Sequence, residues 1–210
     1  EAGYLPETLV NFMALLGWHS TTDKEIFSLE ELTKEFDLGR VQKAGAVFNV
    51  EKLDWLNAQY IKNLDDEVLA KKLGLAPVEH NLKIVVLTKD RMKRLNDFKT
   101  LSGFFFDLPD YPAKMLVWKN TSMSATLDNL KTLEKLLSPL DEEKFAKSDL
   151  EQLLMPLAQE RGRGEVLWPL RAALSGSEAS PGPFEIMDAL GKKETLKRLS
   201  VAIEKLESSS

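Results

Sequence analysis

Apolar residues recur at helical spacing along nearly the whole chain, and this pattern limits the possible folds more than any other feature. The segment from Leu5 to Leu16 carries its apolar residues on one helical stripe and is followed by Gly17, a common helix stop. The segment from Leu127 to Leu137 repeats the pattern before Ser138-Pro139. No segment shows a convincing alternation of apolar and polar residues of the kind that indicates a half-buried strand. The sequence therefore predicts an all-α fold.

Capping signals locate several helix starts. Ser28 and Glu31 form a capping box, in which the hydroxyl accepts from the backbone and the carboxylate reaches back, and the helix should end near Phe36. A second capping box is predicted at Ser148-Asp149-Leu150-Glu151. Further helices are expected after Asn49 and Asp65.

Further helices and loops are expected after residue 80. We expect one long helix from Leu82 to Phe98, with its basic side chains outward. Arg161-Gly162-Arg163-Gly164 is predicted to be a loop. Pro183 suits the first turn of a helix that runs to Leu190, where Gly191 should end it.

The best internal boundary lies at residues 107–112. Pro109 and Pro112 each remove a backbone donor and clash with the preceding turn, so this stretch cannot lie inside a helix. We expect three segments, at residues 1–62, 63–108 and 109–210.

Composition excludes several classes of site. The chain has no cysteine, which excludes a disulfide scaffold, a cysteine-ligated zinc and a thiol nucleophile, and fits a reducing, cytoplasmic setting. His19 and His80 lie in different segments, without a carboxylate at ligand spacing. No apolar run reaches the roughly 18 residues that a membrane span needs. We therefore expect no metal, no cofactor, no membrane contact and no catalytic site in this chain.

The charge distribution leaves two interpretations open. The net charge of −5 argues against a nucleic-acid partner. Between Lys83 and Lys99, however, six basic residues stand against Asp90 and Asp97, for a local charge of about +4. Phosphates respond to local potential, so a basic face can bind RNA; the alternative is a set of solvated helix faces.

Long motifs at both ends of the chain carry a family resemblance. They are Gly3 to Trp18, Glu25 to Ser28, Phe36 to Leu38, Ala46 to Asn49, Lys52 to Asn57, Tyr60-Ile61, Pro169 to Ser177 and Phe184 to Gly191. In this order they resemble the part of bacterial glutamyl-tRNA synthetases, class I aminoacyl-tRNA synthetases, that follows the catalytic domain.

The resemblance implies a helical stem-contact region followed by a helical anticodon-binding region. The two catalytic signature motifs of that family do not occur here, so the chain alone should be inactive. The parent protein would join glutamate to tRNA(Glu) with ATP and Mg. The implied partners are tRNA(Glu), with tRNA(Gln) as a second candidate, and the parent's own catalytic domain; DNA is not implied.

The resemblance also implies anticodon-reading residues. Arg91 corresponds to an arginine that contacts the last anticodon base in the family; the alternative is a surface arginine paired with Asp90 or with a helical neighbour. Arg171 corresponds to a second arginine near the anticodon, with direct contact and an orienting role left equally open. The loop that approaches the anticodon in relatives is Ser180-Pro181-Gly182-Pro183. Relatives often have a larger apolar residue where Pro183 stands, which leaves a platform role for this position in doubt.

Contacts with the tRNA stem or backbone are expected from a second group of residues, namely Lys43, Lys52, Asn57, Lys89 and Arg94. The competing hypothesis is a helical protein-interaction domain without an RNA role. It would show a large exposed apolar patch in place of a basic one.

Overall fold

The computed structural model describes residues 2–41 and 47–209, and in these ranges every regular element is helical. The prediction of an all-α fold is thereby confirmed. Contacts between Cα atoms divide the chain into two units, and each is described by itself. Unit 1 comprises Glu1–Val78 and Thr88–Leu101, and unit 2 comprises Glu79–Leu87 and Ser102–Ser210. The three predicted segment boundaries stay predictions.

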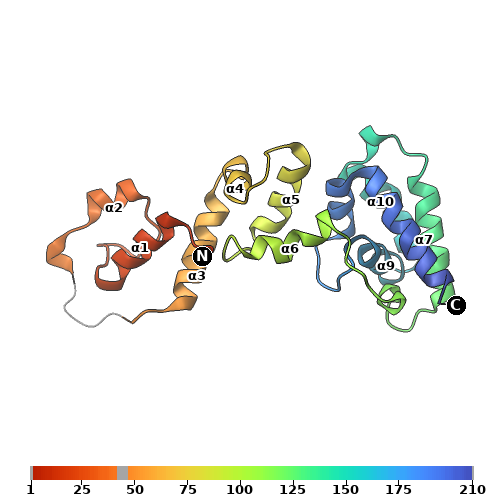
Figure 1. The fold of residues 1–210 in the computed structure, drawn as a ribbon, viewed down its shortest axis with the longest axis horizontal. Coiled ribbons are helices and arrows are strands. Elements are labelled where there is room, and N and C mark those ends of the chain that lie inside the picture. The colour runs from red at the N-terminus through yellow and green to blue at the C-terminus, as the bar shows by residue number, and fades with distance from the viewer. Residues whose placement is uncertain (1, 42–46, 210) are drawn as a thin grey trace. The chain divides into compact units, whose positions relative to one another are not determined.

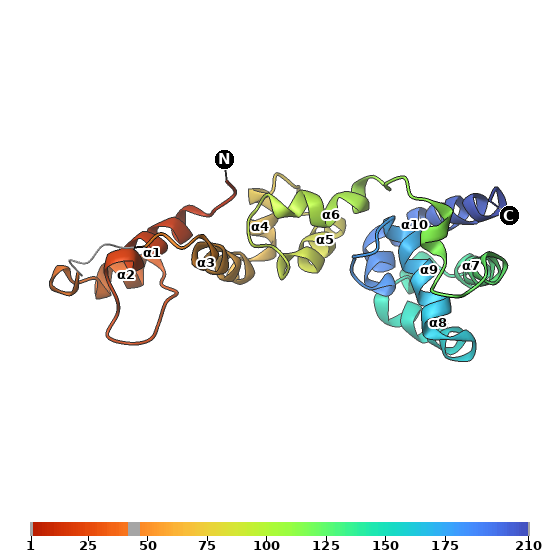
Figure 2. The same ribbon diagram turned by 90° about the horizontal axis from the view of Figure 1, so that it is seen from below.

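Unit 1 holds the first four α-helices. They are α1 (Pro6–Gly17), α2 (Leu29–Glu35), α3 (Val50–Asn63) and α4 (Asp66–Lys72), with a short 3-10 helix η1 (Leu38–Arg40) after α2. Figures 1 and 2 show α1 beside α3, and the two helices are in contact.

The expected caps of unit 1 are present. The Ser28 hydroxyl accepts from the amide of Glu31 at 3.1 Å, and the Glu31 carboxylate accepts from the amide of Ser28 at 2.8 Å. Asn49 accepts from the amide of Lys52 at 3.0 Å, and Asp65 caps α4. Each cap satisfies amides that the first helical turn leaves without an internal partner.

Two apolar clusters form the core of unit 1. One consists of Phe12 of α1 with Leu53 and Leu56 of α3. The other consists of Trp18, Phe27 and Leu32. Because α1 contributes to the first cluster and its C-terminal flank to the second, this helix holds the unit together.

The expected long helix from Leu82 to Phe98 is wrong. The chain forms α5 (Glu79–Lys89), a turn, and then α6 (Asp97–Phe106). The Asp97 carboxylate accepts from the amides of Lys93 and Arg94, both at 2.8 Å, and so favours a new helix start over continuation of α5.

Unit 2 is a bundle built around α9. Its elements after α6 are η2 (Ala113–Leu116), α7 (Met123–Leu137), η3 (Glu142–Lys144), α8 (Lys147–Arg161), α9 (Arg163–Ser175) and α10 (Pro183–Glu207). Helices α7, α8 and α10 all contact α9, and Figure 2 shows the four helices grouped together.

Two further expectations for unit 2 are corrected. The second capping box is absent, because α8 already begins at Lys147 and Ala146 precedes it without a side-chain cap. The loop expected at 161–164 is reduced to Gly162, whose φ of 102° separates α8 from α9. Gly191 interrupts α10 with φ 74° and ψ 170°, so a break occurs where a stop was expected.

Across residues 2–41 and 47–209, no helix has both the length and the apolar character needed to span a bilayer.

Candidate nucleic-acid interface

The Arg171 side chain holds the loop that follows α9. Its Nη2 donates to the carbonyl oxygen of Glu178 at 3.0 Å, and its Nη1 donates to the Ser180 hydroxyl at 3.5 Å. Burial lowers the pKa of the Arg171 guanidinium, although an arginine side chain keeps its charge in proteins. These bonds fit an orienting role for Arg171, and direct contact with RNA stays a prediction.

The predicted anticodon loop lies between two helices. Ser180, Pro181 and Gly182 are half-buried, while Glu178 and Ala179 before them are exposed. Pro183 is the first residue of α10, as predicted, and its side chain is buried. Main-chain groups of the loop are therefore partly accessible, whereas the Pro183 side chain belongs to the packing of α10.

Arg198 fixes the end of α9, from which the loop begins. This guanidinium is 1% exposed, and its Nη1 donates to the carbonyl oxygen of Leu174 at 2.6 Å and to that of Phe104 at 2.7 Å. Leu174 lies in the last turn of α9, just before the loop begins. Because a helix leaves its last carbonyls without internal partners, Arg198 supplies donors that this end needs.

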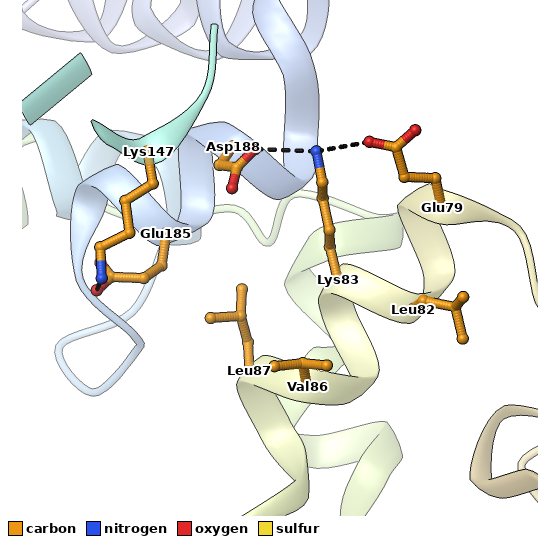
Figure 3. A pocket seen from close by; sticks show the side chains of 8 residues that line it. All are labelled: Glu79, Leu82, Lys83, Val86, Leu87, Lys147, Glu185 and Asp188. Carbon is orange, nitrogen blue, oxygen red and sulfur yellow. Dashed lines mark hydrogen bonds and ion pairs between the residues drawn. The ribbon is translucent and has the colours of Figure 1, made fainter. Parts of the chain in front are cut away.

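A hollow of about 590 Å³ opens within unit 2, beside the start of α10. Figure 3 shows the eight side chains that line it, three of them apolar. They are Glu79, Leu82, Lys83, Val86, Leu87, Lys147, Glu185 and Asp188. Ligand pockets typically span about 300–1,000 Å³, so this hollow has room for a small planar group.

Two sets of ion pairs border the hollow. Lys83 lies 3.0 Å from Glu79 and 2.9 Å from Asp188, and its hydrogen bond to Asp188 raises the pKa of the ammonium group. Lys147 lies 2.7 Å from Glu185. Burial raises the pKa of Glu185, but the hydrogen bond from Lys147, a backbone hydrogen bond and the attraction of the Lys147 charge together outweigh it, and the net shift is downward. The hollow therefore combines an apolar wall with a charged border.

Arg91 lies in the turn between α5 and α6 and not on a basic helix as expected. It is exposed, and its side chain forms no hydrogen bond or ion pair with any residue that the structure describes. The expected alternative, pairing with Asp90, is not observed, because Asp90 instead pairs with Lys62 at 3.2 Å. The Arg91 guanidinium is thus available to a ligand.

Lys89 and Arg94, the other predicted residues of this segment, are engaged within unit 1. Lys89 donates to the carbonyl oxygen of Leu64 and to Asp66, and its side chain is 15% exposed. Arg94 donates from Nε and Nη2 to the two carboxylate oxygens of Asp54, at 2.8 and 3.0 Å. Any phosphate would compete with these partners.

The remaining stem candidates differ in their surroundings. Lys52 is paired with Glu25. Asn57 is fully buried, accepts from the amide of Leu5 at 2.9 Å and donates to the carbonyl oxygen of Lys93 at 2.6 Å, so it acts as an internal bridge. Lys43 lies outside the described residues. Contact with RNA by any of the predicted residues stays a prediction.

Sequence analysis did not identify Trp168 and Arg198 as site residues. Trp168 precedes Arg171 by three residues, a spacing that places both on one helix face, and this signal was readable. Arg198 follows its partner Glu194 by four residues, but its carbonyl partners are distant in sequence and no local pattern points to them.

Two models of known protein families match the chain. The family model described as "Anticodon binding domain" matches residues 29–203. A second model, "tRNA synthetases class I (E and Q), catalytic domain", matches residues 1–55. The chain belongs to the anticodon-binding domain family.

Relatives specify the type within this family. The chain is 40% identical over 219 residues to a glutamate–tRNA ligase of Lachnoclostridium phytofermentans, covering 100% of this chain and 44% of that protein. It is 38% identical over 218 residues to one of Flavobacterium johnsoniae, covering 98% of this chain and 42% of the relative. It is thus an anticodon-binding domain of the glutamate–tRNA ligase type, and it spans less than half the length of these relatives.

Solved structures agree. The crystal structure of a glutamate tRNA ligase from Elizabethkingia meningosepticum, in complex with its amino acid, matches with a TM-score of 0.85 at 35% identity, covering 97% of this chain and 42% of that one. The glutamate-tRNA synthetase of Elizabethkingia anophelis matches with a TM-score of 0.80 at 32% identity, covering 96% and 41%.

Proposed function

We propose that this chain binds the anticodon loop of tRNA(Glu), as the RNA-reading part of a longer ligase that joins glutamate to this tRNA. The observation that carries the proposal is the Arg171 side chain, which holds loop 177–182 at the place where the family resemblance expects an anticodon contact. Single-stranded RNA loops are recognised by hydrogen bonds to splayed bases and by stacking on planar groups. A half-buried loop with partly accessible main-chain groups offers the first kind of contact.

The hollow in unit 2 supports the same function. An unstacked base is a flat, largely apolar group with polar edges. Leu82, Val86 and Leu87 would contact its faces, while Lys83 and Asp188 present a donor and an acceptor at the border. Arg91 supplies a further, separate contact, for which the last anticodon base is the proposed partner.

The remaining parts of the proposal concern the longer protein. Residues 1–62 would contact the tRNA stem, and ATP with Mg would be used at a catalytic site in the parent. The proposed setting is the cytoplasm. tRNA(Gln) is a second candidate substrate, because Arg91 favours discrimination between the two tRNAs but does not decide it alone.

Filter binding with transcripts of tRNA(Glu) tests the proposal. We expect Arg91→Ala to weaken binding by about 1–3 kcal/mol and to reduce discrimination at the last anticodon base, as loss of a bidentate base contact would. Arg171→Ala should weaken binding to every transcript that keeps the anticodon loop. Arg163→Ala is the matched control, because it removes the same charge from the exposed start of α9.

Salt and competitor RNAs sharpen this test. Affinity should fall steeply with salt, because several phosphate contacts release counterions. A transcript with all three anticodon bases replaced should bind more weakly than the native one. The affinity for a tRNA(Gln) transcript tests whether this tRNA is a second partner. Equal binding of the native and replaced transcripts by the wild-type chain would refute anticodon recognition and favour the protein-interaction alternative.

A further inference from the structure

Trp168 packs its indole ring against the guanidinium of Arg171. The guanidinium carbon lies 4.7 Å from the ring centroid, within the range of a cation–π contact. The indole Nε1 donates to the carbonyl oxygen of Met115 at 2.9 Å, and this bond fixes the ring's orientation. Arg171 therefore rests on a surface that is itself held in place.

A second tryptophan supports the first. The rings of Trp118 and Trp168 have centroids 5.0 Å apart and planes inclined at 43°. Trp118 lies directly against the backbone of α9, because a Cβ atom on Gly164 would come within 2.1 Å of its Nε1. Lys119 places its ammonium 4.8 Å from the Trp118 ring centroid. Lys119, Trp118, Trp168 and Arg171 are thus linked by successive ring contacts.

We propose that Trp168 is a positioning residue for RNA recognition, which fixes the plane of the Arg171 guanidinium so that loop 177–182 keeps one conformation before RNA arrives. The bonds to Glu178 and Ser180 require the Nη atoms of Arg171 to face the loop. An arginine without a supporting surface has many rotamers, and each immobilised side chain costs binding free energy. Because the stacked indole already immobilises Arg171 in the free protein, this cost does not arise when RNA binds.

The inference rests on the proposed function for its RNA readout, but not for its structural readout. Hydrogen exchange of the free chain measures the order of the loop without any RNA. The affinity for tRNA measures whether the order of the loop matters for recognition. Failure of the proposed function would appear in the wild-type chain, whereas failure of the positioning role would appear only in the Trp168 variants.

The experiment compares Trp168→Leu, which removes the aromatic face, with Trp168→Phe, which keeps a ring for the guanidinium. Leu167→Ala is the control, because it trims the neighbouring half-buried side chain on another face of α9. Each variant is examined by circular dichroism for its fold. Exchange is then followed in peptides that cover residues 176–183, and binding is measured with the tRNA(Glu) transcript.

We expect exchange of the loop to become about tenfold faster in Trp168→Leu and tRNA binding about tenfold weaker, the scale of a half-buried cation–π contact. Trp168→Phe should restore most of both effects, and the control should change neither. In the double variant with Arg171→Ala, the leucine substitution should add little further loss, because the two residues act as one unit. Unchanged loop exchange in Trp168→Leu, or fully additive losses, would overturn the positioning role.

Discussion

Replacement of Arg198 by methionine should destabilise unit 2 severely. The side chain is 1% exposed, and it joins three separate parts of the unit. It donates to the Glu194 carboxylate at 2.8 Å, to Phe104 and Leu174 at 2.7 and 2.6 Å, and to Phe105 at 3.4 Å. Methionine has similar length and retains the apolar packing, but it has no donor.

The magnitude follows from the acceptors that would be left behind. The two carbonyl oxygens closest to Arg198 lie in the last turns of α6 and α9, where no internal amide can replace the lost donor. A hydrogen bond from a charged group contributes roughly 1.5–3 kcal/mol, so two short ones account for most of an expected loss of about 3–5 kcal/mol. Glu194 adds less, because its side chain is 34% exposed and water can solvate the freed carboxylate.

Native-state hydrogen exchange is the suitable assay, since it reports the opening free energy of α9 and α10 without assuming that both units unfold together. Lys197→Met is the matched control: its side chain is 71% exposed, and surface substitutions usually stay within about 0.5 kcal/mol. Arg198→Lys keeps the charge but cannot reach every acceptor, so an intermediate loss is expected. If the slowest amides of α9 in Arg198→Met kept their opening free energy within about 1 kcal/mol, the capping argument would be refuted.

Two further predictions concern one residue in each unit, Asp54 in unit 1 and Gly191 in unit 2. The hydrogen bonds that Arg94 donates hold the pKa of Asp54 below its ordinary value, so the carboxylate contributes stability above about pH 4 that is lost as pH falls through the folded pKa. Asp54→Asn should therefore lower the stability of unit 1 at pH 7, and this difference should shrink progressively as pH falls below about 4; a pH-independent difference in urea titrations would contradict the prediction. Gly191→Ala should cost about 1–3 kcal/mol, from backbone strain alone, because φ is 74° and no atom lies within 4 Å of the added Cβ; thermal denaturation would measure it, and an unchanged midpoint would disprove it.

The features predicted correctly from the sequence are those that local chemistry decides. A capping box such as Ser28 with Glu31 needs only residues three apart, and the structure contains both of its bonds. The starts of α3 and α4, the absence of helix at 107–112 and the interruption at Gly191 are equally local. Periodicity sufficed for the all-α class because no competing alternation was present.

The errors arose where two local signals competed. The apolar spacing from Leu82 to Phe98 fits one helix, but Asp97 accepts from the amides of Lys93 and Arg94 and begins a second one. This correction moves Arg91 from a helix face into an exposed turn. At the border of the hollow, Lys83 binds Asp188. The two residues are 105 positions apart in the sequence, so no local spacing could predict their contact.

Loop 177–182, the proposed anticodon contact, is held at both ends in the free chain, and this would make recognition through its main-chain groups feasible. At one end, Arg198 binds the last turn of α9; at the other, Pro183 is buried as the first residue of α10. Between them, Arg171 binds the carbonyl oxygen of Glu178 from its stacked position on Trp168. Main-chain groups carry no side-chain identity, so their specificity depends on fixed geometry, and a loop with several conformations would accept more than one base. A loop that had to order on binding would also lose overall affinity. The supporting side chains should therefore affect discrimination between anticodons, as well as overall affinity, whenever they are removed.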